Sequence, residues 1–302
     1  MFQLKYFNLF RPTGKNCSED INECESSPCI NNGTCRDLIA DFNCTCPRNY
    51  TGKRCETKLT SCVPNPCFNN GSCTQHPENN NYTCECSPGF GGALCENVTT
   101  IGLSGSSFMF FQLDRNAFEL SFQFRTTLGY GLLAADSQNT FLVFLETENV
   151  TIVYNKVTKL SVGKTANLSD GHWHTIHINI SSSSVSVTVD NSSCGQHCVA
   201  SSSLQTQVRL TDLYVGGSPF GPSYDHNTLY NFTGCIQDVT IDRNTVIPTG
   251  SQVSLVNTSI ECLRREVCAS NPCAHGKCVD KWIKYSCECE RRWIGSQCNA
   301  SE

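Results

Sequence analysis

Cysteine spacing constrains this chain more than any other feature. Eighteen of its 23 cysteines fall into three groups of six, and each group reads C-x4-C-x4/5-C-x8/10-C-x-C-x8-C. A segment of roughly 30 to 35 residues is too short to be held by apolar burial alone, so each group must be crosslinked. The groups are Cys24, Cys29, Cys35, Cys44, Cys46 and Cys55; Cys62, Cys67, Cys73, Cys84, Cys86 and Cys95; and Cys268, Cys273, Cys278, Cys287, Cys289 and Cys298.

The spacing favours disulfide bonds over zinc as the crosslinks. The sequence has no C-x-x-C pair, and no histidine stands at ligand spacing in the three groups. Disulfides at this density persist outside the cytosol, so an extracellular chain is predicted. Each bridge closes a loop of about ten residues and should stabilise its module by about 2–3 kcal/mol.

Composition excludes several other classes of protein. Glycosylation sequons of the form N-x-S/T recur from Asn16 to Asn299, which suits a secreted chain. The net charge of −5, without a basic block, argues against a nucleic-acid partner. No apolar run approaches the ~18 residues of a membrane span.

Cys17 stands outside the three groups. Residues 12–17 (PTGKNC) closely repeat residues 50–55 (YTGKRC), which end the first group. We therefore expect Cys17 to be the unpaired last cysteine of a truncated module in a longer extracellular protein, with any membrane anchor in the full-length parent. A free thiol or an intermolecular bridge is the alternative.

The middle of the chain has a β-strand pattern. In 118–125, Phe118, Leu120, Phe122 and Phe124 alternate with polar residues, and 174–180 and 185–189 repeat this period of two. Segments 141–145 (FLVFL) and 150–154 (VTIVY) are apolar throughout and suit central strands. Glycines punctuate these runs, so many short antiparallel strands in a two-sheet sandwich are predicted.

These patterns resemble two known module families. The cysteine groups resemble EGF-like modules, and the middle segment resembles a laminin G-like jelly roll. The second match rests on residues 118–125 (FELSFQFR), 170–174 (DGHWH), 213–217 (LYVGG) and 232–238 (FTGCIQD). The expected fold is mostly β: a laminin G-like jelly-roll sandwich flanked by small disulfide-rich EGF-like modules.

The resemblance also implies the domain boundaries. These are 1–19 for the remnant of a truncated EGF-like module, 20–56 for the first EGF-like module, 58–96 for the second, 98–262 for the laminin G-like domain and 264–299 for the third EGF-like module.

The disulfide pairing is likewise implied by the resemblance. Within each EGF-like module the first cysteine pairs with the third, the second with the fourth and the fifth with the sixth. Cys194 and Cys198 are left over and are expected to form a local bridge. The Cys194–Cys198 bridge is not a feature of either family. The pairs that the resemblance implies are Cys24–Cys35, Cys29–Cys44, Cys46–Cys55, Cys62–Cys73, Cys67–Cys84, Cys86–Cys95, Cys235–Cys262, Cys268–Cys278, Cys273–Cys287 and Cys289–Cys298.

A calcium site is expected in the first module. Calcium takes six to eight oxygen ligands, and Asp20, Glu23 and Asp37 offer three carboxylates in two half-motifs. Three acids solvated on a loop are the alternative. Resemblance to calcium-binding EGF modules implies that the carbonyls of Ile21, Leu38 and Asp41 complete the shell.

The other domains offer weaker metal signals. Residues 59–61 (LTS) and 264–267 (RREV) precede the first cysteines of the second and third modules and lack the acidic pair, so no calcium is expected there. Asp136 and Asp225 are the acids available on the laminin G rim, where a solvated loop acid is the favoured interpretation.

Four hydroxyls match sugar-attachment patterns of EGF-like modules. Ser26 and Ser270 fit the O-glucose pattern C-x-S-x-P-C, and Thr34 and Ser72 precede a third cysteine as O-fucose sites do. Plain loop hydroxyls are the alternative.

Catalysis is not indicated. His172, His174 and His177 lie near Trp173, and we expect Trp173 in the core with the histidines at the surface. With Cys17 taken as the remnant of a truncated module and the other cysteines paired, no thiol is left as a nucleophile, and a secreted hydrolase is a remote alternative.

The module order is similar to that of Crumbs-type ectodomains. The resemblance implies a non-enzymatic, calcium-binding adhesion or polarity protein at the apical plasma membrane, whose laminin G-like domain binds extracellular proteins or glycans. Neither nucleic acid nor a small-molecule substrate is expected. A secreted matrix component of agrin or eyes-shut type is the alternative, and a basic cluster on the laminin G rim would favour it.

Overall fold

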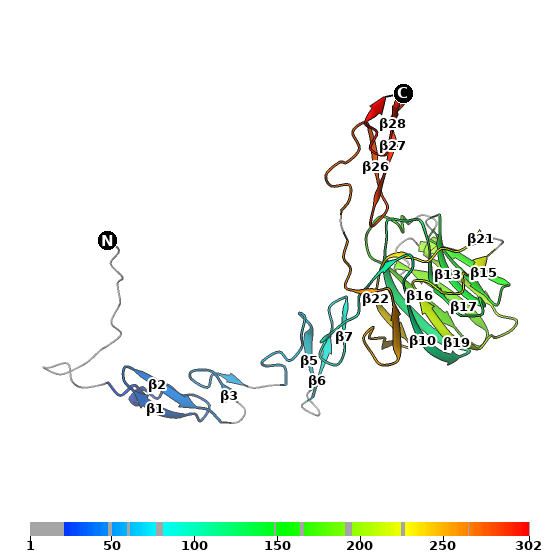
Figure 1. The fold of residues 1–302 in the computed structure, drawn as a ribbon. Coiled ribbons are helices and arrows are strands. Elements are labelled where there is room, and N and C mark those ends of the chain that lie inside the picture. Colours follow the sequence, from blue (N-terminus) through cyan, green and yellow to red (C-terminus); the bar gives the residue numbers. More distant parts are fainter. Residues whose placement is uncertain are drawn as a thin grey trace. The chain divides into compact units, whose positions relative to one another are not determined.

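The computed structural model describes residues 21–47, 50–58, 61–76, 81–147, 149–163, 166–190, 195–224, 227–264 and 266–301. The predicted remnant 1–19 with Cys17 lies outside these ranges. The chain forms two compact units, of which the first ends at Glu85 and the second begins at Cys86. The boundary therefore falls inside the predicted second module. Nearly all regular structure is β, as expected (Figure 1).

The first unit consists of short hairpins. A 3-10 helix, η1 (Glu23–Ser26), precedes them. The hairpins pair β1 (Thr34–Leu38) with β2 (Asp41–Thr45), β3 (Tyr50–Thr51) with β4 (Thr57–Lys58), and β5 (Ser72–His76) with β6 (Asn81–Glu85).

Disulfides provide most of the interior of the first module. In the described part of the first module, the buried residues are Pro28, Cys44 and Cys55. The structure forms the pairs that the resemblance implies. Cys198 is also disulfide-bonded, and its expected partner, Cys194, lies outside the described residues. The disulfide bonds within the described residues are Cys24–Cys35, Cys29–Cys44, Cys46–Cys55, Cys62–Cys73, Cys67–Cys84, Cys86–Cys95, Cys235–Cys262, Cys268–Cys278, Cys273–Cys287 and Cys289–Cys298.

The second unit is built around a sandwich of two antiparallel sheets (Figure 1). One sheet has the order β15-β14-β13-β12-β19-β10-β24, and the other has the order β18-β17-β16-β11-β22-β9-β25, with β23 beside β22. The first contains β10 (Phe108–Arg115), β12 (Tyr130–Ala135), β13 (Phe141–Glu146), β14 (Asn149–Tyr154), β15 (Thr158–Val162), β19 (Leu210–Val215) and β24 (Val253–Val256). The second contains β9 (Ile101–Ser104), β11 (Phe118–Arg125), β16 (His174–Ile180), β17 (Ser184–Val189), β18 (Val199–Ser203), β22 (Thr233–Ile241), β23 (Asn244–Thr245) and β25 (Ser259–Ile260).

Period-two alternation places the main core between the sheets. Phe118, Leu120, Phe122 and Phe124 of β11 are at most 3% exposed, while the residues between them are half-buried. The inward residues of β16 and β17 join the same cluster. Burying one such phenylalanine stabilises the fold by about 1.5–3 kcal/mol. The predicted strands and their inward faces are confirmed.

The segments that are apolar throughout have buried side chains on both faces. Leu142, Phe144 and Val153 point away from the main core and form a second, smaller cluster on the outer face of their sheet. Tyr224 and Leu229, from the loop that contains β20 (Ser223–Tyr224) and β21 (Asn227–Thr228), cover this cluster. This second layer explains why β13 and β14 do not alternate.

Parts of two EGF-like modules complete the second unit. The end of the second module pairs β7 (Phe90–Gly91) with β8 (Asn97–Val98). The third module pairs β26 (Gly276–Asp280) with β27 (Tyr285–Cys289) and β28 (Trp293–Ile294) with β29 (Ala300–Ser301). A 3-10 helix, η3 (Gly195–Cys198), precedes β18.

Position 234 in β22 accepts only glycine, for two reasons. Its φ is +154°, and a Cβ there would lie 2.3 Å from the Arg125 carbonyl and 2.7 Å from the Phe232 ring. Gly234→Ala should therefore lower the free energy of unfolding by at least about 2 kcal/mol in denaturant titration. Gly195→Ala is the matched control, since φ is +64° there with no described atom within 4 Å. Equal losses in the two variants would contradict the steric argument.

Candidate functional site

The predicted calcium residues of the first module meet where η1 packs against β1. The backbone N–H of Glu23 donates to Asp37 Oδ1 at 3.1 Å, and the Cys24–Cys35 bridge joins the two elements directly beside this contact. Glu23 Oε2 is buried and has no hydrogen-bond partner. A buried carboxylate oxygen without a donor is costly, and a cation beside Glu23 and Asp37 would remove that cost.

The remaining predicted calcium ligands differ in their exposure and in their contacts. Ile21 and Leu38 are partly exposed, and Asp20 lies outside the described residues. The Asp41 carboxylate accepts from Lys53 Nζ at 2.6 Å and from the Phe42 N–H at 2.8 Å. The hydrogen bond from Lys53 lowers the pKa of Asp41, and the Phe42 N–H adds to this effect. The Asp41 side chain is therefore bound to Lys53 and the Phe42 amide. Only the backbone carbonyl of Asp41 was expected to be a calcium ligand.

Three or more metal-ligating side chains do not converge anywhere in the described ranges. On the laminin G rim, Asp136 is 3% exposed and caps the turn between β12 and β13. Its carboxylate accepts from Thr140 N at 2.7 Å, Thr140 Oγ1 at 2.6 Å and Phe141 N at 2.8 Å. Asp136 therefore stabilises the hairpin, and its interpretation as a solvated loop acid was wrong. Asp225 lies outside the described residues.

All four predicted sugar-attachment hydroxyls are on exposed residues: Ser26, Thr34, Ser72 and Ser270. The Ser26 hydroxyl donates to the Glu23 carbonyl at 2.8 Å, within η1. Exposure makes these positions accessible to a modifying enzyme, and their use stays a prediction.

An aspartate joins the second module to the sandwich. Asp238, at φ +54° in β22, accepts from the Gly89 N–H at 3.1 Å through both carboxylate oxygens. The Thr99 hydroxyl donates to the same carboxylate at 2.5 Å. Asp238 belongs to the laminin G-like motif at 232–238, and the structure shows that it holds the end of the preceding module.

An arginine joins the third module to the sandwich. Arg264 Nη2 lies 2.9 Å from Asp280 Oδ2, and Nη1 donates to the Gly171 carbonyl at 3.3 Å. Gly171 belongs to the loop between β15 and β16, and Asp280 ends β26. Arg264 therefore bridges a sandwich loop and the third module.

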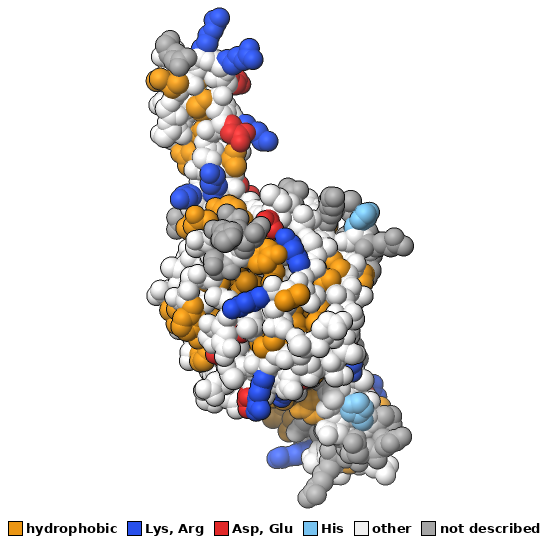
Figure 2. Space-filling view, turned by 90° about the vertical axis from the view of Figure 1, so that its right-hand side faces the viewer, with side chains coloured by type: hydrophobic (Ala, Val, Ile, Leu, Met, Phe, Trp, Pro, Cys, Tyr) orange, Lys and Arg blue, Asp and Glu red, His pale blue; other side chains and the backbone are white. Residues whose placement is uncertain are grey.

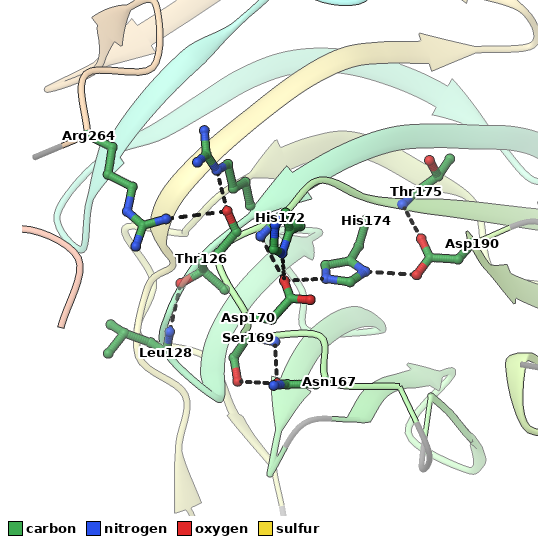
Figure 3. Close-up of polar contacts among 12 residues, drawn as sticks. Thr126, Leu128, Asn167, Ser169, Asp170, His172, His174, Thr175, Asp190 and Arg264 are labelled. Atoms are coloured by element: carbon green, nitrogen blue, oxygen red, sulfur yellow. Dashed lines mark hydrogen bonds and ion pairs between the residues drawn. The ribbon is translucent and has the colours of Figure 1, made fainter. Parts of the chain in front are cut away.

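His174 also holds the loop between β15 and β16, through a contact with Asp170. Its Nδ1 lies 2.8 Å from Asp190 Oδ2, and its Nε2 lies 3.1 Å from Asp170 Oδ1 (Figure 3). Burial alone would lower the pKa of His174, but the hydrogen bonds and charges of Asp190 and Asp170 outweigh burial and raise it. Burial raises the pKa of Asp170, but the hydrogen bonds from His172 and His174 outweigh it, so the net shift is downward.

Two expected positions in this segment were wrong, because His174 was expected at the surface and Trp173 in the core. His174 is 8% exposed and points inward with Ile176 and Ile178, whereas Trp173 is half-buried and His172 is exposed. The alternation of β16 dictates this arrangement, because His174 shares the parity of the inward isoleucines. Two aspartates supply the hydrogen bonds that allow a polar ring to be buried.

Sequence reasoning missed the roles of the residues that join loops to strands and modules. These residues are Asp190, Asp238, Arg264, Asp280 and Trp282. Trp282 is 2% exposed, with its ring centroid 5.1 Å from the Arg264 guanidinium. A signal existed for Asp280, because it follows its module's third cysteine by two positions, as Asp37 does.

The laminin G-like domain also carries a groove of about 650 Å³. Two exposed tyrosines, Tyr130 and Tyr230, line it, with ring centroids 6.1 Å apart in an edge-to-face arrangement. Figure 2 shows the lysines and arginines on one face of the sandwich as isolated positions, not as one patch.

Comparisons with known proteins agree with this architecture. Residues 124–244 match the laminin G domain family, and residues 24–54, 62–94 and 268–297 match the EGF-like domain family. The chain therefore belongs to the modular extracellular proteins that combine EGF-like and laminin G domains. Within that class it resembles a segment of the Crumbs-type ectodomains.

Two relatives with similar sequences support this placement, and one solved structure aligns with part of the chain. Protein crumbs homolog 1 of Mus musculus is 33% identical over 95% of this chain, and the chain covers 23% of that protein. Protocadherin-like wing polarity protein stan of Drosophila melanogaster is 29% identical over 93% of this chain and 9% of that protein. The LG1-3 region of the laminin alpha2 chain aligns over 56% of this chain and 36% of that chain, with 20% identity and a TM-score of 0.46.

Within the described ranges, no helix has the length and apolar composition that a membrane crossing requires.

Protonation of His174 should stabilise the fold, because only the imidazolium can donate to both aspartates. The folded pKa is raised, so this stabilisation is fully present below about pH 6.5 and is lost as the pH rises through the folded pKa. His174→Gln should therefore destabilise the sandwich more at pH 5.5 than at pH 8.5 in thermal unfolding. His172→Gln, at the exposed neighbouring histidine, is the control. A loss of thermal stability in His174→Gln that does not depend on pH would contradict the stabilising role of protonated His174.

Proposed function

We propose that this extracellular adhesion and polarity protein works without catalysis, as a binding segment. Its first module holds one calcium ion, and its laminin G-like domain provides the surface for an extracellular protein or glycan. The relatives with these two domain types are Crumbs-like adhesion proteins, which are not enzymes. The chain spans less than a quarter of the mouse relative, so the partner surface is proposed for this segment alone.

The buried Glu23 Oε2 is the observation that carries the calcium proposal. Glu23 and Asp37 are already brought together by a backbone hydrogen bond and a disulfide, so a cation would bind without large rearrangement. Carboxylate and carbonyl oxygens are the ligands that calcium prefers. At the proposed site, Glu23 and Asp37 would supply negative charge, and Asp20 with the carbonyls of Ile21, Leu38 and Asp41 would provide the remaining oxygen ligands.

Bound calcium would tie η1 to β1 and so stiffen the start of the module. Stiffness matters in a modular chain because a module without an apolar core resists bending only through its crosslinks and local contacts. The proposed ion would therefore act on the stiffness of the first module and would take no part in a reaction.

The charge distribution favours this adhesion proposal over a secreted matrix protein that binds sulfated glycans. Within the described laminin G-like domain, three arginines are neutralised by carboxylates, and a fourth donates to a backbone carbonyl. These contacts are Arg115–Asp242, Arg209–Asp114, Arg243–Glu119 and Arg125 with the Gly171 carbonyl. Paired arginines contribute little to the attraction of a polyanion.

Calcium binding should be measured on the full chain by titration calorimetry. We expect a dissociation constant of about 10⁻⁴ to 10⁻³ M, the range of extracellular modules, and at least a roughly tenfold loss in Asp37→Asn. Asp41→Asn is the control, because its carboxylate is engaged by Lys53 and should not reach the ion. Equal affinity of Asp37→Asn and the unmodified chain would sink the proposed site.

Heparin affinity chromatography separates the two functional proposals. The chain should elute at or below about 0.15 M sodium chloride, because three arginines of its laminin G-like domain are paired with carboxylates and exposed charges are screened at that ionic strength. Releasing Arg115 and Arg209 with Asp242→Asn and Asp114→Asn should raise the salt needed for elution. Retention of the unmodified chain well above that concentration would favour the matrix protein instead.

A further inference from the structure

The third module differs from the first at the positions that frame the proposed calcium site. Counted from the first cysteine of each module, Arg264 stands four residues before Cys268, as Asp20 stands four residues before Cys24. Counted from the third cysteine, Asp280 follows Cys278 by two positions, as Asp37 follows Cys35. One acid of the pair is thus kept, and the other is replaced by a cation.

The structure brings these two positions of the third module together. Arg264 Nη2 donates to Asp280 Oδ2 at 2.9 Å, and the two side chains are 17% and 20% exposed. The other oxygen, Asp280 Oδ1, accepts from the Trp282 N–H at 2.7 Å and from the Thr127 hydroxyl at 3.3 Å. The Asp280 carboxylate is therefore satisfied on both oxygens by protein donors.

The Arg264 guanidinium also makes contacts that a lone ion pair would not. It lies 5.1 Å from the centroid of the Trp282 ring, a distance at which a cation is attracted to the aromatic face. It donates to the Gly171 carbonyl of the sandwich loop. Its Nε is buried without a partner, a cost that these contacts have to offset.

We propose that the Arg264 guanidinium occupies, at the third module, the position that calcium occupies at the first. The comparison with calcium rests on the proposed function of the first module, whereas the role of Arg264 in the joint does not. The third module thereby carries its own cation, and its joint with the laminin G-like domain is independent of calcium.

A covalently attached cation behaves differently from a bound ion. Arginine is protonated at every physiological pH, and its planar guanidinium holds a carboxylate in a fixed direction. A calcium ion in an extracellular module dissociates when its concentration falls below about 10⁻⁴ to 10⁻³ M. Depletion of calcium would therefore loosen the chain before the laminin G-like domain and leave the joint after it intact.

Hydrogen exchange of the full chain, followed by mass spectrometry, tests this proposal. Peptides from 276–289 report the third module, and peptides from 21–47 report the first. In the unmodified chain, adding calcium in place of a chelator should leave exchange in 276–289 unchanged. Arg264→Ala should raise exchange there by about tenfold or more, because the Asp280 carboxylate loses its buried counter-charge. Arg292→Ala, an exposed arginine of the same module, should not.

A second variant tests the equivalence with calcium directly. Arg264→Asp together with Val267→Glu restores in the third module the acids found at positions 20 and 23 of the first. Exchange in 276–289 should then become calcium-dependent, with protection recovered in calcium and lost in chelator.

The outcomes separate this proposal from the calcium site of the first module. The proposal is overturned if 276–289 of the unmodified chain responds to calcium, if Arg264→Ala exchanges like the unmodified chain, or if the double variant ignores calcium. If only the calcium response in 21–47 were absent, the calcium site of the first module would be refuted. The dependence on Arg264 of the joint between the third module and the laminin G-like domain would still stand.

Discussion

Disulfide bonds are the constraint on which the rest of this structure depends. In the first module they supply nearly the whole interior, where Cys44 and Cys55 are buried with Pro28. The laminin G-like sandwich instead rests on an apolar core of facing strands. The chain thus combines one body stabilised by hydrophobic burial with small bodies stabilised by restriction of the unfolded state.

Modules without an apolar core have little surface with which to hold their neighbours, so specific polar contacts are needed at the joints. Asp238 receives the Gly89 backbone amide from the end of the second module and the Thr99 hydroxyl from the segment that follows it. Arg264 links a sandwich loop to Asp280 of the third module. His174 holds that loop from inside the sandwich. Each contact places a charged or strongly polar group where burial makes it effective.

Sequence reasoning succeeded where the constraint is local or periodic. Cysteine spacing predicted the EGF-like modules, and period-two alternation predicted β11, β16 and β17 with their inward faces. It failed at His174, although the isoleucines of β16 already fixed the inward parity, because histidine was expected at the surface by its polarity. The partners Asp190 and Asp170 come from other segments, and no local pattern shows that they converge on one ring.

Joints were the hardest features to predict, because they depend on which segments the fold brings together. The Glu23 and Asp37 half-motifs could be paired in advance only because a disulfide pattern was already known for such modules. Arg264 was noted as a departure from the acidic pattern, but its contact with Asp280 required the geometry of the linker. Asp238 was part of a recognised motif, yet its role in holding Gly89 follows from the structure alone.

The central claim is that crosslinks support the small modules and apolar burial supports the sandwich. Graded reduction under native conditions, followed by hydrogen exchange, measures this most directly. Reductant should abolish protection in 21–58 and 266–301 while strands β11, β16 and β22 stay protected, since the sandwich bridge Cys235–Cys262 is buried at Cys235 and adds to an existing core. Protection that survives reduction in the modules, or that is lost simultaneously in the sandwich, would contradict the account.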